Sequence, residues 1–168
     1  MMGLGRGQPQ GDDMRKTYRI LAYIIAIEVV IQAMVMIFAV AGLTKWINDG
    51  ATLDKAVMDS WEEDPPTFTG AVGHFIHTMN GTFLIPLLGL ALLIVSFFAA
   101  VDGAVKWAAI IVVSIVVQVM LGFGSSDAPV LGLVHGLNAF ILFGAALMAA
   151  RSAREAKPDT VDVTSAAT

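Results

Sequence analysis

The chain has 168 residues, of which 57% are hydrophobic and 14% are charged, and its formal net charge is −4. This composition lies far from that of a soluble globular domain and indicates an integral membrane protein. The absence of cysteine excludes disulfides, thiolate metal ligands and the covalent attachment of c-type haem. The acidic charge comes mainly from one loop and the sequence has no basic patch, so we expect no nucleic-acid partner.

The first residues, 1–14, are rich in glycine, glutamine and aspartate, and we expect a disordered cytoplasmic N-terminus. Four apolar stretches follow, and each reaches or exceeds the ~20 residues that cross a bilayer core as a helix. They lie at residues 18–43, 70–100, 104–123 and 129–150. Continuous apolar runs indicate helices and not a barrel, which would show alternation. The predicted fold is therefore all-α, a four-helix membrane bundle over residues 15–155, with a disordered cytoplasmic tail at 156–168.

Lysine and arginine are distributed unequally around these spans. All of them except Lys45 and Lys55 fall on one side of the predicted membrane. Because positively charged residues concentrate on the cytoplasmic side, we expect both termini in the cytoplasm. The predicted location is the plasma (inner) membrane, with lipid as the immediate surroundings of the helices.

The outer loop, residues 44–69, is longer than a simple connection requires. Four of its residues fall at helical spacing between polar ones and predict a short amphipathic helix: Leu53, Ala56, Val57 and Trp61. One interpretation is a lid over the bundle. The other is an interfacial segment that is anchored at headgroup level by Trp46 and Trp61.

Two histidines occupy matching places in the two predicted hairpins. His77 is followed three residues later by Asn80, and His135 is followed three residues later by Asn138. An ionisable side chain in a membrane segment is costly and marks a candidate functional site. Two such side chains in equivalent positions predict one shared ligand.

The helices that precede the histidines also resemble each other. Gln32 in the first span and Gln118 in the third both lie in runs of β-branched residues, and a methionine follows each of them two positions later. Each hairpin therefore consists of a glutamine-bearing helix and a histidine-bearing helix. We expect two pseudo-symmetric hairpins, related by an axis along the membrane normal, with a shared site between facing helices.

The number of histidines indicates the kind of ligand. Zinc usually takes four ligands, or three and a water, whereas haem iron needs only two axial ligands from the protein. The sequence therefore predicts a b-type haem (haem b) bound by His77 and His135 near the outer face. Gly136 would remove bulk beside His135, although Gly132 and Gly136 together also fit simple close packing of helices.

The sequence allows more than one role for each of the other polar residues in the spans. His74 is a candidate alternative axial ligand, propionate partner or proton-transfer group, or a wetted histidine at the helix start. Asn80 and Asn138 would either orient the imidazoles or make ordinary interhelical hydrogen bonds. Pro86 predicts a kink in the second span.

Glu28 lies near the middle of the first span, one turn before Gln32. It is a candidate proton relay or quinone-site acid. The alternative is a neutral glutamic acid that is hydrogen-bonded to Gln32 or Gln118.

Part of this pattern resembles a known family. The segment 118–122, Gln-Val-Met-Leu-Gly, followed by a short loop and then by His135 at the start of the next span, is similar to one half of haem A synthase. That family duplicates a four-helix unit in which a pair of histidines near the outer face binds haem, and the matching positions here are His77 and His135. In length the chain is closer to small four-helix membrane proteins of uncharacterised function that are related to that fold.

The chain departs from the family pattern at several positions. His74 and Thr78 stand where the family has a glutamate and an arginine, and the family's paired loop cysteines are absent. One unit also offers one bis-histidine site, whereas the synthase uses two. We therefore do not expect haem A synthesis by this chain alone, and an enzymatic activity is not the leading expectation.

The expected function is electron transfer, or haem-dependent support of a partner membrane oxidoreductase. With both axial positions occupied by histidine, the iron suits outer-sphere electron exchange. One alternative is a haem-free accessory or assembly subunit, in which His77 and His135 form local hydrogen bonds. Another is a proton-coupled transporter or quinone-linked enzyme that uses Glu28 and His74. A homodimer would recreate an eight-helix assembly.

Overall fold

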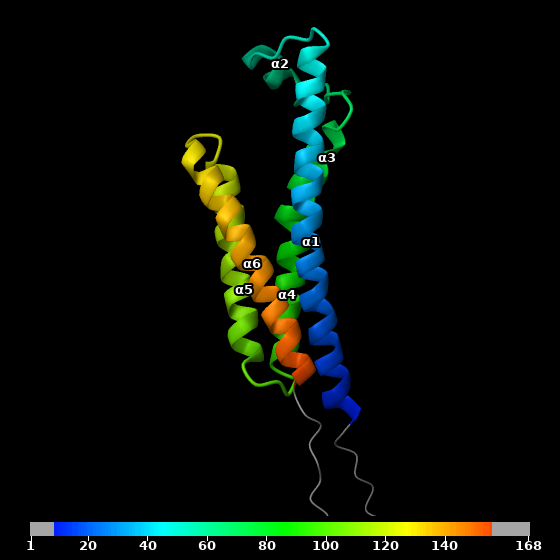
Figure 1. The fold of residues 1–168 in the computed structure, drawn as a ribbon, viewed down its shortest axis with the longest axis vertical. Coiled ribbons are helices and arrows are strands. Elements are labelled where there is room, and N and C mark those ends of the chain that lie inside the picture. Colours follow the sequence, from blue (N-terminus) through cyan, green and yellow to red (C-terminus); the bar gives the residue numbers. More distant parts are fainter. Residues whose placement is uncertain (1–8, 156–168) are drawn as a thin grey trace, which may run out of the picture. The chain divides into compact units, whose positions relative to one another are not determined.

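The computed structural model describes residues 9–155, and all of its regular elements are helical (Figure 1). They are α1 (Pro9–Asn48), α2 (Lys55–Ser60), α3 (Ala71–Met79), the π-helical segment η1 (Asn80–Leu84), α4 (Ile85–Ser96), α5 (Ala104–Gly124) and α6 (Pro129–Glu155). Four helices are long and apolar enough to cross a membrane: α1, the continuous α3–η1–α4, α5 and α6. The prediction of an all-α chain with four candidate membrane spans is confirmed.

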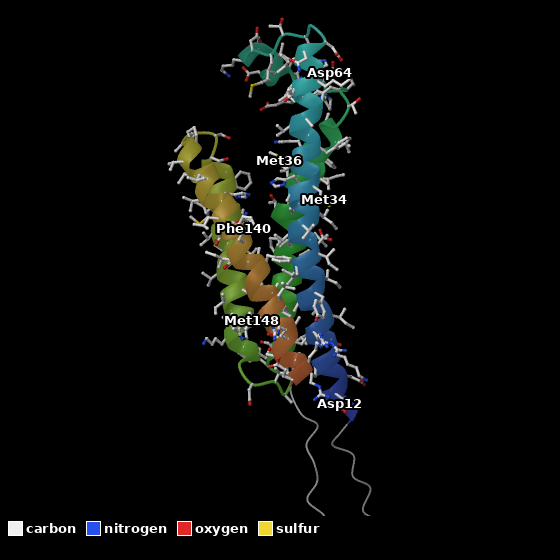
Figure 2. The ribbon with its side chains drawn as sticks, in the orientation of Figure 1. Asp12, Met34, Met36, Asp64, Phe140 and Met148 are labelled. Carbon is white, nitrogen blue, oxygen red and sulfur yellow. The ribbon has the colours of Figure 1, made fainter. Side chains whose placement is uncertain are left out.

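Large apolar side chains lie on the surface of these helices. Met34 on α1 and Phe140 and Met148 on α6 are exposed, and Phe140 has the largest exposed fraction of the three, 77% (Figure 2). Water is a poor solvent for such a surface, whereas lipid tails match it. The four apolar helices and their exposed apolar side chains indicate a multi-pass membrane protein.

The chain forms two compact units. Unit 1 contains the described residues up to Ala26 and from Leu88 onward, and unit 2 contains Ile27–Leu87. Unit 1 therefore includes the first part of α1, most of α4, and all of α5 and α6. Unit 2 includes the rest of α1, together with α2, α3, η1 and the start of α4.

Small residues form much of the core of unit 1. Its buried alanines include Ala22, Ala104, Ala108, Ala146, Ala149 and Ala150. Small side chains let helix backbones approach closely, which is how membrane helices gain packing energy when lipid is as apolar as they are. Tyr18 is fully buried in this core, and its hydroxyl donates a hydrogen bond to the main-chain oxygen of Ala104 at 3.0 Å.

Glycines have the corresponding role between α1 and α3 in unit 2. A Cβ atom added at Gly42 or Gly73 would collide with the backbone of the facing segment, at Thr69 and Val35 respectively. Gly70, just before α3, has a φ of +98°, and a Cβ atom there would lie 2.5 Å from the main-chain oxygen of Phe38. Only glycine suits both the left-handed conformation and the close approach.

Two boundaries differ from the sequence prediction. Residues 9–14, predicted to be disordered, belong to α1, because Asp12 in the first turn favours the helix N-terminus and pairs with Arg15 at 2.7 Å. The first part of the predicted outer loop is also helical, since α1 continues to Asn48, and Lys45 in its last turn pairs with Asp49 at 2.7 Å. The rest of the predicted disordered ends, 1–8 and 156–168, lies outside the described residues.

The second span changes its helix type before the predicted kink. Between α3 and α4 the chain makes the π-helical segment η1, and the N–H of Ile85 bonds to the main-chain oxygen of Asn80, five residues earlier. Pro86 follows immediately and has no N–H to donate. A widened turn is a known way for a helix to accommodate such a residue.

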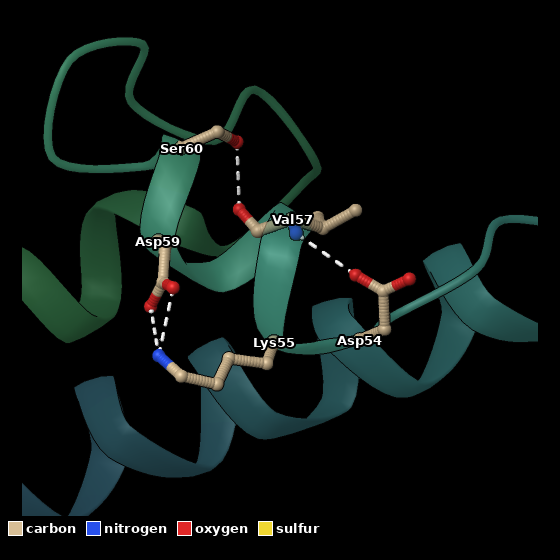
Figure 3. Close-up of polar contacts among 5 residues, drawn as sticks. All are labelled: Asp54, Lys55, Val57, Asp59 and Ser60. Atoms are coloured by element: carbon tan, nitrogen blue, oxygen red, sulfur yellow. Dashed lines mark hydrogen bonds and ion pairs between the residues drawn. The ribbon is translucent and has the colours of Figure 1, made fainter.

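The outer loop contains one short helix, α2 (Figure 3). Asp54 caps it by accepting a hydrogen bond from the N–H of Val57 at 2.9 Å, and Lys55 pairs with Asp59 at 2.7 Å. None of its residues is buried. The structure tests neither interpretation of this segment, so the lid and the interfacial segment both stay predictions.

Three aromatic rings gather beside α2. The ring centroids of Trp46, Trp61 and Phe68 lie 5.8 to 6.3 Å from one another. Such contacts each add to the stability gained from apolar burial. The cluster therefore ties the loop to the end of α1 and to the segment before α3.

We predict that Tyr18→Phe destabilises unit 1 by about 1 kcal/mol, because the main-chain oxygen of Ala104 loses its buried donor. Thermal unfolding of the detergent-solubilised protein measures this loss. Tyr23→Phe is the matched control, since the structure shows no hydrogen bond from the Tyr23 hydroxyl within the described residues. An equal effect of the two substitutions would contradict the assigned role of the Tyr18 hydroxyl.

We predict that Asp54→Ala lowers the free energy of local unfolding of α2 by about 1 kcal/mol, because the first turn of the helix loses its N-cap. Backbone amides of α2 should then exchange with solvent several-fold faster, while the global melting temperature stays unchanged, since α2 buries no residue. Glu62→Ala, also in the loop, is the control and should leave this exchange unaltered.

Candidate functional site

His77 contacts the neighbouring helix of its own hairpin. Its Nδ1 lies 3.2 Å from the main-chain oxygen of Gln32 on α1. A carbonyl oxygen can only accept a hydrogen bond, so Nδ1 carries the proton. In the neutral ring the lone pair is then on Nε2, which is the usual state of a metal-binding histidine.

His135 makes the same contact in unit 1. Its Nδ1 lies 3.0 Å from the main-chain oxygen of Gln118 on α5, and the Gln118 amide donates back to the main-chain oxygen of His135 at 3.1 Å. Gly122, one turn after Gln118, leaves room for the ring, because a Cβ atom there would lie 3.3 Å from the His135 Cε1. These contacts fix both the orientation and the tautomer of the imidazole.

The position of the histidines along their helices is also the same. His77 is the seventh residue of α3 and His135 is the seventh residue of α6. Each histidine donates its Nδ1–H to the main-chain oxygen of the glutamine in the preceding helix, Gln32 for His77 and Gln118 for His135. The repeat in sequence is thus accompanied by the same local contact in each unit, although pseudo-symmetry of the whole hairpins stays a prediction.

The two asparagines make interhelical hydrogen bonds. Asn138 is buried, and its Nδ2 donates to the Gln118 Oε1 at 2.6 Å and to the main-chain oxygen of Ser114 at 2.9 Å. Asn80 instead donates to the Glu28 Oε2 at 2.9 Å. Asn138 therefore positions the glutamine that holds His135, whereas Asn80 binds a carboxyl group.

The structure shows neither of the two partners, Gln32 or Gln118, that one interpretation of the sequence gave to Glu28. The partner of the Glu28 carboxyl is Asn80, because Asn80 faces it from the adjacent helix. The Gln32 side chain is only 9% exposed, and its Oε1 and Nε2 have no hydrogen-bond partner among the described residues.

Two predicted site residues make no contact that would assign them a role. His74 is exposed on α3, one turn nearer the helix start than His77. Gly136 is exposed, and a Cβ atom there would meet no atom within 4 Å. The glycine that accommodates an imidazole is Gly122, the last residue of the family-like segment 118–122.

The described residues contain no group of three or more His, Asp or Glu side chains that could hold a metal ion. The histidines described above offer one imidazole in each unit. Haem iron can take histidine as an axial ligand from a protein.

Comparison with protein-family models, with curated proteins and with solved structures found no match. The resemblance to haem A synthase therefore stays a prediction from the residues quoted for it.

We predict that Gly122→Val disrupts the hydrogen bond between His135 and Gln118, because its Cβ atom would crowd the imidazole. Stability should fall by about 1–3 kcal/mol in thermal unfolding, and nitrogen NMR of the histidine should show loss of the fixed Nδ1–H tautomer. Gly144→Val is the control, since a Cβ atom at Gly144 meets no atom within 4 Å. An unchanged tautomer in the Gly122 variant would show that this glycine does not set the ring position.

Proposed function

We propose that the protein binds one b-type haem within the membrane through His77 and His135, and that it transfers electrons or supports a partner oxidoreductase. One observation carries the proposal. In each unit the Nδ1–H of the histidine bonds to the backbone carbonyl of the paired glutamine. Such a bond orients a ligand histidine and makes its other nitrogen a better donor.

The chemistry of the residues fits this cofactor. Both imidazoles have their proton on Nδ1, so Nε2 is the atom that each would offer to iron. A haem needs two axial ligands from the protein and supplies the other four donors itself. When bound, it would supply a centre for one-electron transfer.

The chain's own residues would hold the ligands in place. The Gln118 amide and Asn138 fix the segment that carries His135, and Gly122 leaves room for its ring. His77 and His135 each lie about 9 Å from the start of their own helices, α3 and α6. His74, exposed one turn nearer the start of α3, is proposed to meet a propionate or to transfer a proton.

The proposal includes a location and partners. Both termini lie in the cytoplasm, the membrane is the plasma (inner) membrane, and the haem lies near its outer face. Histidine at both axial positions suits electron exchange with a membrane oxidoreductase or a quinone and not the binding of oxygen. A homodimer would bring two such units into one eight-helix assembly.

A second candidate function is a haem-free accessory subunit. The same hydrogen bonds favour it, because they tie α3 to α1 and α6 to α5 without any cofactor. Under this alternative the histidines only hold helices together, and glutamine or asparagine would replace them with little loss.

We predict sharp low-spin b-type bands in the reduced-minus-oxidised spectrum of the detergent-purified full chain. His77→Ala and His135→Ala should each abolish these bands or convert them to high-spin bands, because the iron loses one axial ligand. Free imidazole should partly restore the low-spin spectrum of either variant.

His74→Ala should retain the low-spin bands, because a histidine that meets a propionate or transfers a proton does not ligate the iron. A chain that is colourless as purified, and still colourless after incubation with haemin, would refute haem binding and favour the accessory subunit.

A further inference from the structure

A pocket lies beside the end of α1, between the aromatic cluster and the segment that follows α2. It has a volume of about 160 Å³, and Trp46, Trp61, Phe68 and Asp64 are among the residues that line it. The three aromatic residues are half-buried, so part of each side chain is accessible. Their ring planes meet at 32° to 61°, so none of the three pairs is a parallel stack. The whole pocket belongs to unit 2.

Asp64 is the charged residue of this pocket (Figure 2). Its carboxylate is exposed and makes no ion pair or hydrogen bond with any residue that the structure describes. The two nearby lysines pair with other acids, Lys45 with Asp49 and Lys55 with Asp59, each at 2.7 Å. No lysine or arginine is among the described residues of the pocket lining. The pocket therefore places an unneutralised negative charge next to aromatic rings.

The backbone of Asp64 is held in place before any ligand arrives. Its N–H donates a hydrogen bond to the main-chain oxygen of Ser60 at 2.9 Å. Pro65 and Pro66 follow directly, line the same pocket and have fixed φ angles. A ligand therefore meets a carboxylate on a constrained segment and needs little rearrangement of the chain.

We propose that this pocket binds a quaternary ammonium group, whose methyl groups contact the aromatic rings while its positive charge lies beside the Asp64 carboxylate. Aromatic faces attract cations, and aromatic pockets are a known means of recognising quaternary ammonium ligands. A metal ion such as Ca²⁺ would need six or more oxygen ligands, whereas this lining offers one carboxylate among aromatic residues and prolines.

The same chemical group occurs in free choline and in the headgroup of phosphatidylcholine. Trp46 lies two residues before the end of α1, which is a candidate membrane span, so the pocket is at the level expected for lipid headgroups. The inference does not depend on haem binding.

Titration with choline chloride tests the proposal, with the full chain in a maltoside detergent and NaCl keeping the ionic strength constant. The chain has three tryptophans, and Trp107→Phe leaves Trp46 and Trp61 as reporters, both in the pocket. We expect a saturable change in tryptophan fluorescence with a millimolar dissociation constant, because cation–π contacts at accessible sites are weak.

The matched ligand is dimethylbutanol, the neutral analogue of choline in which carbon replaces nitrogen. It should bind about tenfold more weakly, because it has the same shape and no charge. A choline response that does not saturate by about 100 mM, or equal binding of the two compounds, would overturn the proposal.

Two variants separate charge from aromatic contact. Asp64→Asn should weaken choline binding about two- to fivefold, as the loss of an accessible ion pair does. Phe68→Leu removes a ring while both reporters remain, and it should weaken binding to a similar extent. Glu62→Gln is the control and should leave the affinity unchanged, since Glu62 does not line the pocket. Equal weakening by Asp64→Asn and Glu62→Gln would show that the charge of the loop, and not the pocket, attracts the cation.

Vesicles distinguish the two sources of the group. In phosphatidylglycerol vesicles, added choline should bind as it does in detergent. If the pocket takes the lipid headgroup, vesicles that contain phosphatidylcholine should already show the fluorescence of the bound state, and added choline should change it little. If the pocket takes only the free amine, choline should titrate equally in both kinds of vesicle.

Discussion

The hydrocarbon core of a bilayer offers no hydrogen-bond partner, and this constraint explains most of what the chain does with its polar groups. The four long helices satisfy most of their backbone groups internally, and several of the polar side chains inside them bond to a neighbouring helix. His77 bonds to the backbone of Gln32, His135 to that of Gln118, and Asn138 to Ser114 and Gln118. These polar residues therefore act as specific links between helices, whether or not they also bind a cofactor.

The four spans and the helical fold could be predicted from the sequence, because hydropathy over ~20 residues is a property of the local chain. Boundaries were less predictable, because the ends of α1 extend past the apolar run into polar residues, where pairs such as Asp12 with Arg15 and Lys45 with Asp49 add only weak local support. The change of helix type at η1 was not predicted either. Pro86 indicated a kink, but a proline does not specify whether the helix bends or forms a wider turn to accommodate it.

The sequence indicated which residues belong to the candidate site, but it did not indicate which atoms they contact. His77, His135, Gln32 and Gln118 stood out because ionisable and polar residues are rare in apolar runs. Their actual contacts involve main-chain oxygens, which every residue carries and which no sequence pattern distinguishes. The pairing of Asn80 with Glu28 depends on how two helices face each other, so sequence spacing within either helix could not reveal it.

The π-helical turn η1 has a consequence for the register of the second span. A π turn holds one residue more than an α turn, so it acts as a single-residue insertion and rotates the following helix face by about 100°. The helix that carries His77 in unit 2 continues as the helix that buries Leu92 in unit 1. The inserted residue thus sets which α4 side chains continue the face of α3 that carries His77, and its deletion would bring other α4 residues onto that face while leaving the amino-acid composition of the span almost unchanged.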